Sequence, residues 1–171
     1  MSYAKRFSSV VLASSLLVGA CGDDGAATTD DTPMGDMAVA SGSASLTGSV
    51  TRSAMPTAGG DGDVYIAVFD RDPVLDMANA VAVGSGFLED ADLSTDDATV
   101  PYTIEDIAVR AEPYFLIAFM DDNDNVDASD MANAGPDSGD LLSLRGLASL
   151  SVTLDTPGAH DLDIDLNSVL P

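Results

Sequence analysis

The sequence predicts an all-β domain, a seven- to eight-stranded antiparallel β-sandwich, placed after a signal peptide and a disordered tether. Two observations predict the sandwich. Short runs rich in β-branched and aromatic residues alternate with clusters of Gly, Pro, Asp and Asn, and no stretch has the spacing of an amphipathic helix. Seven such runs fall within about 125 residues, a density typical of two packed antiparallel sheets.

The N-terminal segment predicts export. Lys5 and Arg6 precede an uncharged stretch from Phe7 to Ala20, which is too short and too interrupted by serine to be a transmembrane helix of roughly 20 apolar residues. The segment Leu17-Val18-Gly19-Ala20-Cys21 resembles the lipobox of bacterial lipoproteins. The resemblance implies that residues 1–20 are a lipoprotein signal peptide, and that lipid on Cys21 anchors the chain in the bacterial cell envelope, in the outer membrane. The alternative is ordinary cleavage after Ala20, which leaves Cys21 as a free thiol.

The segment 21–43 follows as a tether. It is rich in Gly, Ala, Thr, Ser and Asp and has no aromatic residue, which predicts disorder. A flexible chain of this length spans about 26 Å on average, enough to hold a domain clear of a bilayer. One domain then fills residues 44–171 and must fold without disulfides, because Cys21 is the only cysteine.

The charge balance restricts the partners. The chain has 29 acidic and 6 basic residues, and without residues 1–20 the only basic side chains left are four arginines. Such a surface repels nucleic acid and anionic lipid headgroups, so we expect no nucleic-acid partner and no membrane contact except through the N-terminal lipid. The charge favours cations or a basic protein or envelope ligand. The alternative is that the acidic surface only keeps an exported protein soluble.

Seven strands are expected, and two of them are apolar on both faces. The segments 64–69 and 114–120 have uninterrupted apolar runs, so we expect each strand to be central in a sheet, with its outer face covered by a loop or a partner. Pro101 restricts its strand to an edge or a strand start. The last two strands are expected to form a hairpin around Thr156-Pro157-Gly158. The expected strands are Ser45–Arg52, Asp63–Phe69, Ala80–Leu88, Thr99–Ile107, Tyr114–Met120, Leu147–Leu154 and Ala159–Leu166.

The order of these elements resembles immunoglobulin-like sandwiches of the transthyretin-like and carboxypeptidase-regulatory-like families, which occur in bacterial surface proteins. The resemblance rests on Gly48-Ser49-Val50 opening the first strand, on the apolar strand from Tyr65 to Asp70, on Tyr102 to Ile107 leading into Tyr114, and on the expected terminal hairpin. Where the family has a Pro-Gly turn before that tyrosine, this chain has Arg110-Ala111-Glu112-Pro113. The resemblance therefore implies the fold, and no activity is carried over.

An acidic loop between Asp121 and Asp140 predicts a calcium site. Seven carboxylates fall within these twenty residues, and oxygen-bearing side chains stand at alternate positions, as in a loop that curls around a hard cation. The pattern departs from an EF-hand, because Val126 replaces the turn glycine and Ala132 the bidentate glutamate. A solvated acidic loop is the alternative. The candidate calcium ligands are Asp121, Asn123, Asn125, Asp127, Asp130 and Asp140.

A second acidic loop contains Asp70 and Asp72 and follows the other apolar strand. In immunoglobulin-like and transthyretin-like sandwiches the loops in these two places emerge at one end, so we expect Asp70 and Asp72 to approach the Asp121–Asp140 loop and form one acidic pole.

Residues for catalysis are scarce. His160 is the only histidine, and the chain contains no Gly-x-Ser-x-Gly elbow and no His or Cys cluster for zinc. We therefore expect no enzyme but a membrane-anchored binding or structural module. The alternative is a metal-assisted hydrolase that uses the acidic pole. The sequence identifies neither the ligand nor the oligomeric state.

Overall fold

The structure is a computed structural model in which residues 42–127 and 135–171 are described. The lipobox with Cys21, almost all of the expected tether, and Asp130 lie outside these residues. Within them every regular element is a strand, and no helix is present that is long and apolar enough to cross a membrane. The prediction of an all-β sandwich is confirmed.

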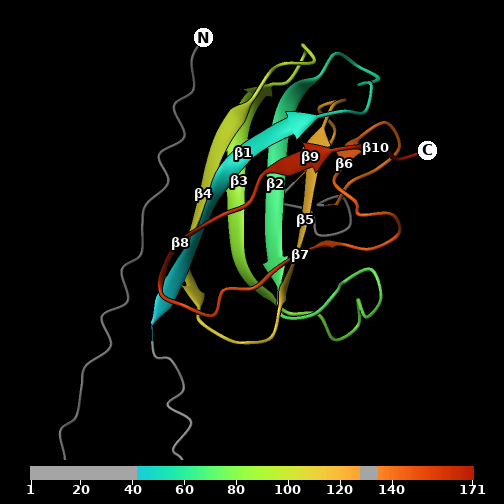
Figure 1. Ribbon diagram of the computed structural model, residues 1–171. Helices are drawn as coiled ribbons and strands as arrows, with labels where there is room; N and C mark the ends of the chain where they lie inside the picture. The colour runs from blue at the N-terminus through green and yellow to red at the C-terminus, as the bar shows by residue number, and fades with distance from the viewer. Residues whose placement is uncertain (1–41, 128–134) are drawn as a thin grey trace, which may run out of the picture. The chain divides into compact units, whose positions relative to one another are not determined.

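Two sheets pack face to face (Figure 1). The four-stranded sheet is built on β1 (Ser43–Arg52), which pairs antiparallel with β4 (Val100–Ala108) along one side. Along its other side, β1 pairs parallel with β8 (Gly158–Asp161) and then with β9 (Ile164–Leu166). This sheet therefore departs from the purely antiparallel arrangement that the sequence predicts.

The six-stranded sheet has the order β10-β6-β5-β2-β3, and β7 pairs with β5 beside β6. Two strands that are far apart in the sequence form its centre, β2 and β5, and they pair antiparallel over seven residue pairs. The strands are β2 (Asp61–Phe69), β3 (Ala82–Asp92), β5 (Tyr114–Asp121), β6 (Leu141–Leu142), β7 (Leu150–Val152) and β10 (Ser168–Val169).

The core lies between the sheets and follows the two-residue period of the strands. The inward residues of β2 and β5 are fully or almost fully buried, and belong to one cluster with the inward residues of β1, β4 and β9. The central position of β2 and β5, the edge position of β4 with Pro101, and the exposure of Asp161, Asp163 and Asp165 are as the sequence predicts. From β2 and β5 the buried core residues are Val64, Ile66, Val68, Leu116, Ala118 and Met120.

The predicted C-terminal hairpin is wrong. β7 pairs with β5 in one sheet, whereas β8 and β9 pair with β1 in the other. Leu154 is fully buried between these strands, and its carbonyl accepts the Arg110 N–H at 2.9 Å, so the chain crosses between the sheets where a hairpin would stay within one. Alternation of apolar side chains determines which face of a strand is buried but not which strand it pairs with.

Glycine is required where β1 passes the segment that joins β8 to β9. The Leu162 N–H donates to the Thr47 carbonyl at 2.8 Å, and the Tyr102 hydroxyl donates to the Leu162 carbonyl at 2.6 Å. A Cβ atom on Gly48 would lie 2.1 Å from that same carbonyl oxygen. Burial raises the pKa of Tyr102, so its hydroxyl stays protonated and keeps donating.

We predict that Gly48→Ala lowers the free energy of unfolding by about 2 kcal/mol, because the added methyl group forces β1 away from Leu162. Urea unfolding of the full chain measures this. Gly135→Ala is the matched control, since Gly135 is exposed and a Cβ there meets nothing within 4 Å. The control should stay within about 0.5 kcal/mol of the parent. Equal stability of the two variants would contradict the close approach at Gly48.

Candidate functional site: an apolar groove with an acidic end

The acidic loop after β5 begins and ends with a buried carboxylate, Asp121 and Asp140. The Asp121 carboxylate accepts the N–H groups of Asn125 at 3.1 Å and Val126 at 2.9 Å, which folds the chain back on itself. Asp140 has no exposed surface, and its carboxylate accepts the N–H groups of Asp137 at 2.9 Å and Asp122 at 3.3 Å. Burial raises the pKa of Asp140, and the charges of Asp121 and Asp137 raise it further.

The structure brings only part of the predicted calcium ligands together. Asp121 and Asp140 interact electrostatically, whereas the side-chain amides of Asn123 and Asn125 donate to the Asp137 carboxylate at 3.2 and 2.8 Å. In the described part of the chain, no group of three or more His, Cys, Asp or Glu side chains is arranged to hold a metal ion. Asp127 is described but Asp130 is not. The calcium site stays a prediction.

Asp122 has a structural role that the sequence does not indicate. Its carboxylate accepts the N–H groups of Thr57, Ala58 and Gly60, each at 2.6 Å, and so holds the loop between β1 and β2 against the end of β5. In the sequence Asp122 is one of seven similar carboxylates in its loop, and its partners are more than sixty residues away. No local pattern distinguishes it from the candidate ligands.

The expectation that Asp70 and Asp72 approach the Asp121–Asp140 loop is wrong. The antiparallel register of β2 and β5 places Asp63 opposite Asp121 and Phe69 opposite Phe115. Asp70 follows β2 seven residues beyond Asp63, so it lies at the opposite end of the sheet, roughly 23 Å along the strand from Asp121. The expectation came from other sandwiches, in which the two loops emerge at one end. Here β2 and β5 pair directly and antiparallel, so the loops that follow them lie at opposite ends of the sheet.

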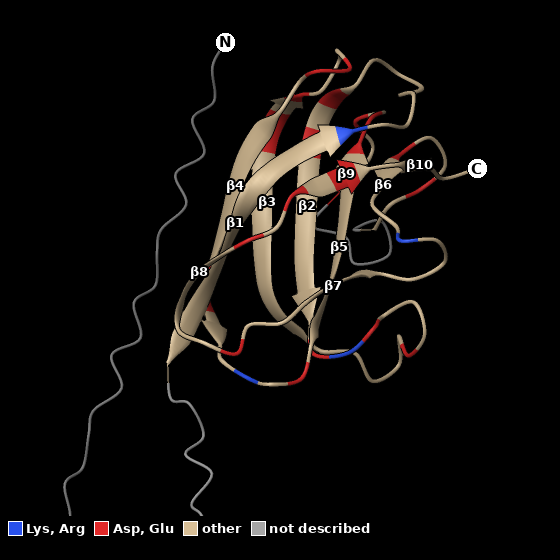
Figure 2. Ribbon diagram, in the orientation of Figure 1, with Lys and Arg blue, Asp and Glu red and all other residues tan. Residues whose placement is uncertain are grey.

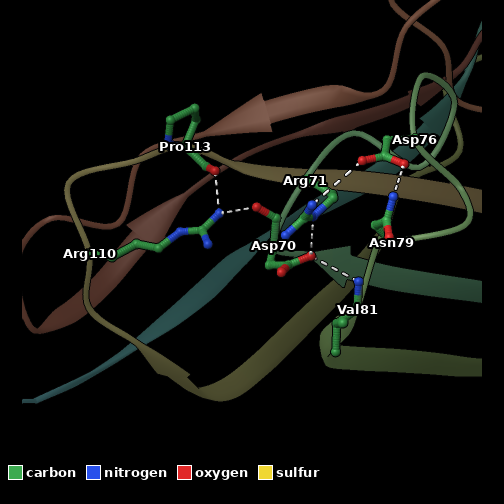
Figure 3. A network of polar contacts seen from close by, with 7 residues as sticks. All are labelled: Asp70, Arg71, Asp76, Asn79, Val81, Arg110 and Pro113. Atoms are coloured by element: carbon green, nitrogen blue, oxygen red, sulfur yellow. Dashed lines mark hydrogen bonds and ion pairs between the residues drawn. The ribbon is translucent and has the colours of Figure 1, made fainter.

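The second acidic loop, residues 70–81, is instead closed by contacts between its two ends, which form its neck (Figure 3). We call it the closed loop. The N–H group of Asp70 donates to the Val81 carbonyl at 3.0 Å, and the Val81 N–H donates to the Asp70 carboxylate at 2.8 Å. The Val81 N–H and the nearby Arg71 lower the pKa of Asp70. Arg110 donates to the Asp70 and Pro113 carbonyls and so ties the neck to the start of β5.

The loop body is also fixed. The Asp72 carboxylate is buried and accepts the Val74 N–H at 2.9 Å and the Ser149 hydroxyl at 2.7 Å. Arg71 lies 3.5 Å from both the Asp70 and the Asp76 carboxylates. The acidic side chains of this loop thus hold its shape, while Val74, Leu75 and Met77 are exposed.

The outer face of the six-stranded sheet is apolar where β3, β2 and β5 lie side by side. Tyr65 stands between Phe87 and Phe119, with ring centroids 5.1 and 4.9 Å away, and Ala67 stands between Ser85 and Ile117. We call this surface the outer apolar face. Its residues are Tyr65, Ala67, Phe69, Val83, Ser85, Phe87, Phe115, Ile117 and Phe119, and all except Ser85 are apolar.

A groove with a volume of about 560 Å³ runs over the outer apolar face. Tyr65, Ala67, Ile117 and Phe119 contribute to its floor. The closed loop provides one wall with Val74 and Met77, and Leu142 and Leu144 line the groove from β6 and the residues after it. The volume lies in the range of sites for ligands of drug size, and large exposed apolar patches mark interaction sites. The sequence predicts a covered outer face, but not the groove.

The outer apolar face ends in carboxylates at the end where β2 begins. Asp63 and Asp121 stand opposite each other one row beyond Tyr65 and Phe119. Asp61, Asp63, Asp90 and Asp124 line an adjoining recess of about 410 Å³. Burial raises the pKa of Tyr65, and the nearby charges of Asp63, Asp121 and Asp124 raise it further, as expected for a phenol beside carboxylates. In Figure 2 the ribbon is coloured for acidic residues where β2 begins and on β3.

No family model, no curated protein and no solved structure matches this chain. The resemblance to transthyretin-like sandwiches therefore stays a prediction. The candidate site is defined by its geometry. It is an apolar groove with the closed loop as one wall and with carboxylates at one end.

Proposed function

We propose that the chain is an exported, lipid-anchored binding protein of the bacterial cell envelope, without enzymatic activity, and that it binds its ligand in the groove on the outer apolar face. The observation that carries the proposal is the apolar composition of that face across three adjacent strands. Phe87 is 53% and Val83 39% exposed on that face, and burying apolar surface is worth about 25 cal/mol per Å², so a ligand that covers these side chains gains free energy.

The ordered closed loop supports the same function. Its neck hydrogen bonds and the Arg110 contacts fix Val74 and Met77 beside the groove before any ligand arrives. A wall that is already in place removes part of the entropy cost of binding. The predicted lipid on Cys21 would hold this site near the membrane at the end of the tether.

Calcium remains a second proposal for the loop between Asp121 and Asp140. Asp140 is fully buried, and the negative charges of Asp121 and Asp137 act on it, so a bound cation would relieve the repulsion that raises its pKa. Carboxylate oxygens are the ligands that calcium prefers. A structural calcium ion there would stabilise the acidic end of the groove.

The anchor is tested by the intact mass of the chain purified from the membrane fraction. We predict that residues 1–20 are absent and that the mass exceeds that of the remaining polypeptide by a diacylglyceryl group, with or without a further acyl chain. A Cys21→Ser variant should be released from the membrane fraction. A processed chain with an unmodified Cys21 thiol would contradict lipid anchoring but leave the groove proposal intact.

Binding in the groove is tested with a neutral apolar dye whose fluorescence rises in apolar surroundings, titrated with the purified full chain. We predict saturable binding, weakened about five-fold by Met77→Ser, since about 1 kcal/mol of apolar contact is lost. Met55→Ser is the matched control, because Met55 and Met77 are both about 80% exposed and only Met77 lines the groove. Equal binding by the two variants would contradict the proposed site.

For calcium, we predict that millimolar calcium stabilises the full chain by about 1 to 3 kcal/mol if its dissociation constant is 10 to 100 μM. Thermal unfolding measures the effect, with magnesium as the control cation. Asp140→Asn should remove the calcium response, whereas Asp106→Asn, an exposed change on β4, should keep it. An unfolding curve that calcium does not change would contradict this proposal.

A further inference from the structure

We infer that the ligand of the groove is a basic, apolar peptide segment of a partner protein, with apolar side chains seated on the outer apolar face and a Lys or Arg at the carboxylates beyond Tyr65. This inference rests on the proposed function, because it names the ligand of the same site. Three features of the described residues support it, namely the acidic end of the groove, its opposite end, and the apolar surface around it.

The acidic end provides the charge complementarity. Asp63 and Asp121 lie two residues along their strands from the Tyr65 and Phe119 pair, a separation of roughly 7 Å. A Lys or Arg side chain next to an apolar anchor residue spans that distance. Asp90 and Asp124 border the adjoining recess and are exposed, so a cation there meets several carboxylates without displacing a buried group.

The opposite end of the groove carries arginines that are already paired. Arg71 contacts the carboxylates of Asp70 and Asp76, and Arg110 donates to the carbonyls of Asp70 and Pro113 (Figure 3). Arg110 also donates to the Glu112 carbonyl. Among the described residues, Arg71 therefore lies in ion pairs with carboxylates at this end, whereas the carboxylates beyond Tyr65 have no ion pair, so the negative charge is less balanced there. Such asymmetry favours one orientation of a ligand that has a positive end.

The apolar surface extends past the groove itself. Phe87 is 53% exposed, Leu75 78% and Met77 79%, and they flank the groove on β3 and on the closed loop. A small organic cation in the groove would leave much of this surface in water. A peptide is large enough to cover both the groove and the apolar surface that flanks it. Exposed methionines adapt to apolar side chains of varied shape. Anionic lipid headgroups are disfavoured by the carboxylates.

The test uses fluorescently labelled peptides and the purified full chain. The first peptide combines two Leu or Phe residues with two Lys, the second replaces Lys by Gln, and the third replaces Lys by Glu. We expect anisotropy titrations to give the tightest binding for the Lys peptide, about ten-fold weaker binding for the Gln peptide and none for the Glu peptide. Raising salt from 50 to 300 mM should weaken the Lys peptide several-fold.

A matched pair of variants locates the charge effect. Asp124 and Asp106 are both exposed and both have left-handed backbone, with φ of 56° and 60°, which Asn tolerates. Asp124→Asn should weaken the Lys peptide about three-fold at low salt, as for loss of one exposed charge pair. Asp106→Asn makes the same change in net charge on the other sheet and should have no effect.

Three outcomes overturn the inference. One is binding of the Glu peptide as tight as that of the Lys peptide, and another is equal binding by the two Asn variants. The third is an apolar alkylammonium ion that binds as tightly as the Lys peptide, which would make a small cation the ligand. In each case, binding of the neutral dye that depends on Met77 would still support the groove, so failure of the inference is distinguishable from failure of the proposed function.

Discussion

The antiparallel pairing of β2 with β5 is the interaction on which the rest of the structure depends. Its register directs Val64, Ile66 and Val68 into the core and places Tyr65 beside Phe119 on the outer face. A shift of one residue would exchange the two faces of a strand. β2 and β5 run side by side in the sheet (Figure 1). Because both faces of these strands are apolar, the same pairing builds the sandwich core and the floor of the groove.

The same register separates two kinds of acidic residue. Carboxylates at the start of β2 and the end of β5 lie together beside the groove, where each adds to an unbalanced negative potential. Those after β2 are used within the closed loop, where Asp70 accepts the Val81 N–H and contacts Arg71, and Asp72 accepts the Ser149 hydroxyl. The negative charge of the chain therefore has different roles at the two ends of the sheet. At one end of the sheet it would orient the proposed ligand, and at the other it holds the loop that lines the groove.

The sequence predicts the class of fold and the central position of β2 and β5, because both depend on local patterns of apolar residues. It does not predict the partner of β8 and β9, since the spacing of Leu162, Ile164 and Leu166 is the same in a hairpin and in a parallel pair with β1. Local sequence patterns also do not predict that Asp122 holds the loop between β1 and β2, or that Asp70 lies at the other end of the sheet from Asp121. Both follow from which strands pair and in which direction, and that pairing joins residues more than forty positions apart in the sequence.

The most direct test of the central claim, that the outer apolar face is the binding surface, is the methionine methyl NMR spectrum of the full chain with and without the neutral apolar dye. Met77 lies in the wall of the groove, Met55 lies in the loop after β1, and Met120 is buried in the core behind the floor. The account predicts a large, saturable shift of the Met77 signal, little change of the Met120 signal and no change of the Met55 signal. A shift of Met55 with Met77 unmoved would contradict it.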